Sequence, residues 1–141
     1  MRVMVIVKAS KESEQGMLPT TDILRMMNKF NEDLADAGVL LAADGLTPSS
    51  KGKRVRFEGA KKTVIDGPFA ETKELIAGFW VWKVKSMDEA VEWLKKAPFG
   101  GGMEIEIRPV GELADFGDAA TPDIRESQKR LAARMRQNAS H

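Results

Sequence analysis

Several short stretches of the chain either alternate apolar and polar residues or are apolar throughout, which is the pattern of β-strands. Residues 2–8 (RVMVIVK) are apolar at both alternating sets of positions, as expected of a central strand covered on both faces. Residues 54–57 and 62–65 flank Glu58-Gly59-Ala60, so we expect them to pair as a β-hairpin. The other predicted strands are residues 39–46, 77–85 and 103–110.

Two further stretches place their apolar residues at helical spacing. The second of these helices is predicted to start at Ser86, which forms a capping-box pattern with Glu89, and to end before Pro98. The first covers residues 21–37, and Gly38 follows it, where glycine caps a helix in a left-handed conformation. Its apolar stripe consists of Ile23, Met27, Phe30, Leu34 and Ala37.

These elements follow one another as strand, helix, strand, hairpin, strand, helix, strand. Without the hairpin this is the ferredoxin-like βαββαβ arrangement, so we predict an α+β domain over residues 1–110 with an inserted β-hairpin. Both helices should lie on one face of an antiparallel sheet. Residues 111–141 form a loop and helix extension, in which Thr121-Pro122 is a typical helix start.

The predicted sheet has apolar residues on the face that the helices leave open. A large exposed apolar face is unusual in a monomer, so we expect a homodimer that packs sheet against sheet. The alternative is that the C-terminal segment folds back over the open face.

Composition excludes several kinds of chemistry. The chain of 141 residues has no Cys and no Tyr, and its single His is the final residue. Disulfides, thiolate nucleophiles and cysteine metal sites are thereby excluded, and we expect no metal and no cofactor. The net charge of +1 argues against a nucleic-acid partner. No stretch reads as a signal peptide or a membrane span, so we expect a cytoplasmic protein with no membrane partner.

One string of residues is highly specific. Residues 66–74 read DGPFAETKE, and the chain resembles the DGPF branch of the YCII-related proteins. The resemblance covers residues 1–110, which would form a YCII-related domain. Further matching segments are Gly38-Val39-Leu40, Gly45-Leu46, Ala77-Gly78-Phe79, Asp88-Glu89-Ala90 and Glu106-Ile107-Arg108-Pro109.

The resemblance implies a dimeric, ferredoxin-like α/β-barrel fold. The wider family is associated with acid–base chemistry by a His–Asp pair, and some relatives act on small chlorinated ring compounds. This sequence has no histidine that matches the pair, so that activity does not carry over. Genes for DGPF proteins often accompany alternative sigma factors in bacteria, which implies a link to transcriptional regulation.

The DGPF segment gathers candidate catalytic groups. Gly67 and Pro68 would hold Asp66 in one geometry, and Glu71 and Glu74 follow within the same string. A carboxyl in a cleft near a second carboxylate has a raised pKa and suits general acid or base work. The candidate ligand-binding residues are Asp44, Arg54, Phe69, Lys73 and Trp80.

The candidate functional residues also have purely structural interpretations. Asp-Gly-Pro is ordinary turn chemistry, and the acidic residues after it could form a solvated face. Trp80 and Trp82 line a pocket in one interpretation and pack the core or an interface in the other. Six basic residues between positions 51 and 62 favour a solvated hairpin over an anion site, given the neutral total charge.

The sequence therefore leads to two hypotheses of function. The first is a small-molecule-binding protein or acid–base enzyme with a carboxylate-lined cleft near the dimer interface. The alternative is a non-catalytic regulatory or protein-interaction module of a bacterial sigma-factor pathway. A structural dimer without a pocket is the third possibility.

Overall fold

The computed structural model of the chain describes residues 1–140. The chain divides into two compact units, Met1–Val110 and Gly111–His141. The first unit contains the elements β1 (Arg2–Lys8), α1 (Lys11–Glu14), α2 (Thr21–Asp36), β2 (Leu40–Gly45), η1 (Ser49–Lys51), β3 (Lys53–Glu58), β4 (Lys61–Asp66), η2 (Thr72–Glu74), β5 (Ile76–Lys83), α3 (Met87–Lys95) and β6 (Ile105–Pro109). The second contains η3 (Leu113–Ala119) and α4 (Pro122–Ala139).

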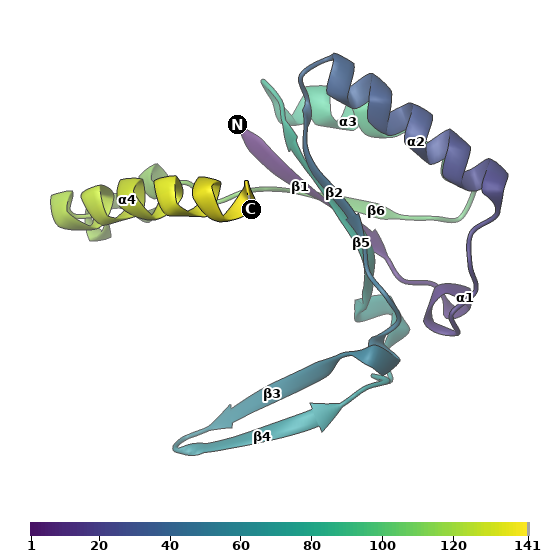
Figure 1. The fold of residues 1–141 in the computed structure, drawn as a ribbon, viewed down its shortest axis with the longest axis horizontal. Helices are drawn as coiled ribbons and strands as arrows, with labels where there is room; N and C mark the ends of the chain where they lie inside the picture. The colour runs from purple at the N-terminus through teal and green to yellow at the C-terminus, as the bar shows by residue number, and fades with distance from the viewer. Residues whose placement is uncertain (141) are drawn as a thin grey trace. The chain divides into compact units, whose positions relative to one another are not determined.

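The first unit has the predicted α+β architecture. Its antiparallel sheet has the strand order β2-β5-β1-β6, and α2 and α3 lie on the same face of this sheet (Figure 1). Strands β3 and β4 pair only with each other and form a separate two-stranded sheet. The ferredoxin-like order with an inserted hairpin is thus confirmed.

The core lies between the sheet and the two helices. Val3 and Val5 of β1 and Leu34 of α2 are fully buried, and Trp82 of β5 packs beside them. The ring of Phe30 meets Trp80 edge to face, with centroids 5.8 Å apart. Both tryptophans therefore belong to the core, as one of the two interpretations of this pair predicted.

The other face of the sheet carries the remaining apolar residues of the two central strands. Ile6 is opposite Phe79, and Met4 is opposite Val81. Because side chains alternate along a strand, these four face away from α2 and α3.

The helix capping also follows the sequence in part. Gly38 takes the left-handed conformation with φ 75° after α2.

The structure corrects four details of the prediction. The connection before α2 contains the short helix α1, whose start is capped by Ser10. Ile23 of the predicted stripe is exposed, because the core contacts of α2 begin one turn later at Met27. The Ser86 hydroxyl caps α3 as predicted by accepting from the Glu89 backbone N–H at 3.1 Å, but the Glu89 carboxylate accepts from the backbone N–H of Lys85, at 2.6 Å, rather than of Ser86. Helix α4 starts at Thr121-Pro122 as predicted, but the Thr121 hydroxyl donates to the Asp123 carboxylate at 2.5 Å and accepts no capping bond from the backbone.

Candidate functional site

A hollow in the helix-facing side of the sheet arises from two glycines. Gly45 of β2 is opposite Gly78 of β5, and Val7 of β1 is the next residue in the same row. Gly78 lies two residues before Trp80, so this row faces the same side as the core. Two adjacent positions without side chains leave space between the sheet and α2.

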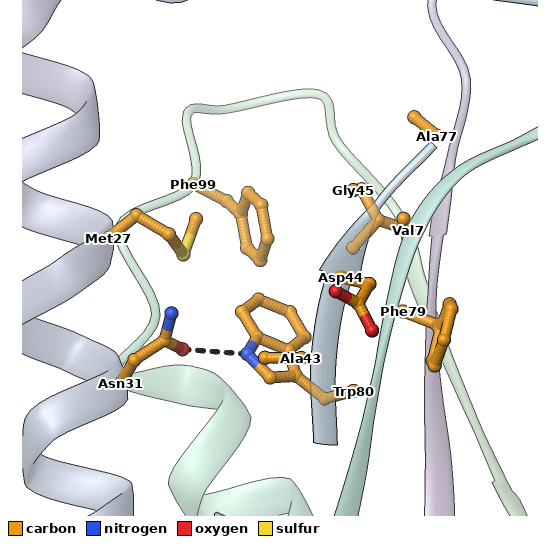
Figure 2. A pocket seen from close by; sticks show the side chains of 11 residues that line it. Val7, Met27, Asn31, Ala43, Asp44, Gly45, Ala77, Phe79, Trp80 and Phe99 are labelled. Atoms are coloured by element: carbon orange, nitrogen blue, oxygen red, sulfur yellow. Dashed lines mark hydrogen bonds between the residues drawn. The ribbon is translucent and has the colours of Figure 1, made fainter. Parts of the chain in front are cut away.

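Side chains from three parts of the fold wall the hollow (Figure 2). Met27 and Asn31 come from α2, Trp80 from β5, and Phe99 from the link between α3 and β6. The rings of Trp80 and Phe99 meet edge to face with centroids 5.9 Å apart. The resulting cavity has a volume of about 240 Å³ and a mostly apolar lining. Such a pocket with few polar groups is typical of small-molecule sites.

One polar side chain points into this hollow. The Trp80 indole N–H donates to Oδ1 of Asn31 at 2.8 Å, as drawn in Figure 2. This bond fixes the amide so that its Nδ2 donor has no hydrogen-bond partner among the described residues. Asp44 of β2 also borders the hollow, but it is paired with Phe79, so its exposed carboxylate lies on the opposite face of the sheet. The hollow thus offers one free donor.

The DGPF turn docks against the segment before the hairpin. The backbone N–H of Gly67 donates to the carbonyl of Gly52 at 3.0 Å, and that of Phe69 donates to the Ser49 hydroxyl at 3.1 Å. A Cβ on Gly67 would lie 1.8 Å from the carbonyl oxygen of Ser49. Only glycine allows this approach of the two backbones. The turn interpretation of Asp-Gly-Pro is thereby supported for Gly67.

Ser49 connects this turn to α1. The carboxylate of Glu14 accepts hydrogen bonds from the Ser49 backbone N–H, at 2.9 Å, and from the Ser49 hydroxyl. These two donors lower the pKa of Glu14 from its ordinary value of 4.5, because they stabilise the ionised form. Three segments distant in sequence are therefore joined at one serine.

The predicted site residues fall into two separate places. Asp44 and Trp80 border the hollow, whereas Arg54, Phe69 and Glu74 line a second groove of about 420 Å³ beside the DGPF turn. The guanidinium of Arg54 lies 3.8 Å above the ring of Phe69.

The other candidates lie outside both spaces. Asp66 pairs with Lys53 across the hairpin at 2.5 Å, and its side chain is 73% exposed. Glu71 is exposed and lines neither space. The side chain of Lys73 lies outside the described part of the chain.

Several site residues carried no signal that the sequence analysis used. Met27 belongs to the predicted apolar stripe and Asn31 lies on the same helix, but the contact of either residue with the hollow depends on how α2 sits on the sheet. Phe99 lies in a link that has no periodic pattern. Gly45 and Gly78 appeared only as matching residues of the family segments, and a glycine in each of two predicted neighbouring strands is the signal that could have found the hollow.

The described residues contain no cluster of three or more side chains suited to hold a metal ion. Across residues 1–140, no helix combines the length and the apolar run needed to cross a bilayer.

Comparison with known proteins gives the chain a family. An uncharacterized protein of Rhizobium meliloti (strain 1021) is 32% identical over 92 residues, which cover 62% of this chain and 73% of the relative. A 5-chloro-2-hydroxyhydroquinone dehydrochlorinase from Burkholderia phenoliruptrix AC1100, solved with 2,5-dihydroxybenzoquinone, has a TM-score of 0.40 and 15% identity over 79% of this chain and 96% of its own. The YCII-related domain model matches residues 1–114. The chain therefore belongs to the family of YCII-related domain proteins.

Proposed function

We propose that the protein binds a small molecule in the hollow between α2 and the sheet. The observation that carries this proposal is that the paired residues Gly45 and Gly78 both lack a side chain. The space they leave is bordered by the rings of Trp80 and Phe99. Large aromatic residues around an unfilled space are costly in a packed core, because cavities forfeit dispersion contacts. A ligand would restore those contacts.

The size and lining of the hollow favour a ligand with a single ring. An apolar cavity of about 150 Å³ accommodates benzene, and this one is about 240 Å³. The free donor of Asn31 would meet an acceptor such as a carbonyl oxygen. The ligand class is thus a single ring that carries a carbonyl oxygen.

An acid–base role for Asp66, Glu71 and Glu74 stays a prediction. All three are exposed in the single chain, as is Asp44, and exposed carboxylates lack the desolvation that tunes a catalytic acid.

We further propose that two copies pack through the open faces of their sheets, giving a dimeric α/β barrel. Met4, Ile6, Phe79 and Val81 form an apolar patch on the two central strands of that face. Phe79 directly precedes Trp80 and points away from the hollow in Figure 2. The hollow and the dimer interface would then lie on opposite faces of β5. The sequence predicted a cleft near the dimer interface. The function would reside in the domain of residues 1–110, with residues 111–141 as an extension.

Fluorescence titration tests the binding proposal directly. Trp80 borders the hollow, so single-ring phenols, hydroxybenzaldehydes and quinones should quench tryptophan emission in a saturable way. Asn31→Ala should weaken the best of these ligands about tenfold or more, the range for losing one strong hydrogen bond. Asn28→Ala is the matched control, because Asn28 lies on the same helix and does not border the hollow.

Two outcomes would contradict the proposal. One is an absence of saturable quenching across the whole panel, which would favour the protein-interaction module instead. The other is binding that Asn31→Ala leaves unchanged relative to Asn28→Ala.

A further inference from the structure

We propose that the groove beside the DGPF turn is a second binding site, which takes small organic carboxylates. This groove has a volume of about 420 Å³ and shares no lining residue with the hollow under α2. Its lining includes Leu46, Lys51, Arg54, Phe69, Glu74 and Leu75.

Arg54 is held in position for an anion. Its guanidinium carbon lies over the Phe69 ring, 3.8 Å from the centroid, and Phe69 is fixed in turn by the hydrogen bond from its backbone N–H to Ser49. No carboxylate of a described residue lies within ion-pairing distance of Arg54. A guanidinium that stacks on a ring keeps its N–H edge free, and that edge matches the two oxygens of a carboxylate.

The other charges of the groove leave a positive excess for the ligand. Lys51 has no ion pair among the described residues, whereas Lys53 is neutralised by Asp66. Glu14 already uses both carboxylate oxygens to accept hydrogen bonds from Ser49. Glu74 is the one carboxylate of the groove with no bound donor among the described residues. Two free cations therefore face one free carboxylate.

The rest of the lining defines the body of the ligand. Leu75 is buried at the floor, and Leu46 and Ile76 are about half exposed at the sides. An apolar wall next to a fixed guanidinium suits a carboxylate attached to a short aliphatic chain or a ring. Inorganic anions would gain nothing from this wall.

Calorimetric titration of the full chain with benzoate and hexanoate tests the proposal. Arg54→Gln should weaken both ligands tenfold or more, because it removes the charged fork. Arg56→Gln is the matched control. It lies two residues along the same strand, pairs with Glu58 at 3.8 Å and does not line the groove. Glu74→Gln should tighten binding severalfold, since it removes a repelling charge.

A variant that fills the hollow distinguishes binding in the groove from binding in the hollow. Gly45→Val fills the hollow and should leave benzoate affinity unchanged, whether or not the hollow binds its own ligand. The proposal is overturned by any of three results. These are no measurable heat with either carboxylate, equal effects of Arg54→Gln and Arg56→Gln, or weaker binding in Glu74→Gln, which would show that Glu74 does not repel the ligand.

Discussion

At the scale of single residues, the DGPF string contains one position that has no room for a larger side chain and one that has ample room. Gly67 approaches the Ser49 carbonyl so closely that a methyl group cannot be placed there. Asp66 is mostly exposed and makes a surface ion pair with Lys53. The string therefore does not act as a unit, and its first two residues should respond very differently to substitution.

Gly67→Ala should destabilise the protein by about 1–3 kcal/mol, the range for overpacking, because backbone must move on both sides of the contact. Asp66→Asn should cost at most about 1 kcal/mol, as expected for an exposed ion pair. Urea unfolding of both variants measures the difference. Gly100→Ala serves as a control, since a Cβ there meets nothing within 4 Å. Equal losses in Gly67→Ala and Asp66→Asn would show that the contact with Ser49 is not the reason for the glycine.

The residue scale also shows where sequence information ends. The string DGPF marked a constrained segment correctly, because Gly and Pro report backbone geometry locally. It did not reveal Ser49 and Glu14, the side chains that hold the turn, because they lie about 20 and 50 residues away along the chain. Contacts of this kind depend on the tertiary arrangement and have no periodic signal.

At the scale of elements, α1 is joined to η1 through Glu14 and Ser49 rather than through apolar packing. None of the four residues of α1 is buried. So short a helix is marginal by itself, and its tie to Ser49 is the contact that connects it to the groove. The strength of that tie should depend on pH, because the acceptor is a carboxylate.

Glu14→Gln should lower the melting temperature near neutral pH and have little effect in acid. The pKa of Glu14 is lowered in the folded protein, so its contribution is present above the ordinary value of 4.5 and is lost as pH falls through the lowered pKa. Melting temperatures of wild type and variant, compared from about pH 7 to about pH 3, should therefore converge. Glu12→Gln, two residues earlier in the same helix, should show no such convergence. A constant gap between wild type and Glu14→Gln would contradict the carboxylate's role.

Elements were the level that the sequence predicted best. The strands and the two main helices of the domain follow from their periodicity, because each buries one face or stripe. The short helices α1 and η3 were missed because they bury almost nothing and leave no stripe. The hollow was missed for a related reason, since it is defined by what Gly45 and Gly78 lack.

At the scale of the whole molecule, the open face of the sheet is the feature that favours packing against a second protein surface. The patch of Met4, Ile6, Phe79 and Val81 lies on the two central strands, where neither α2 nor α3 covers it. A single sequence predicts such a face from alternation alone. It does not identify what covers the face, because that depends on a second surface.

Val81→Lys should convert the proposed dimer to a monomer, because it would place a charge in the apolar centre of each sheet face. Sedimentation velocity measures the change, and circular dichroism checks that the fold persists. Val91→Lys on α3 is the control, because that side chain is partly exposed on a helix outside the sheet face. A wild-type protein that sediments as a monomer would contradict the dimer, as would a Val81→Lys variant that remains dimeric.

The most direct test of the central claim is the affinity of a single-ring phenol for Gly45→Val, measured by calorimetry beside wild type and Gly100→Val. A Cβ at Gly45 meets nothing within 4 Å, so valine should fill the hollow without disturbing the fold. We predict that the variant melts at or above the wild-type temperature, because a residue with fewer unfolded conformations replaces glycine. Its affinity for the phenol should fall tenfold or more, while Gly100→Val binds as wild type does. An undiminished affinity in a well-folded Gly45→Val would place the ligand elsewhere and contradict the account.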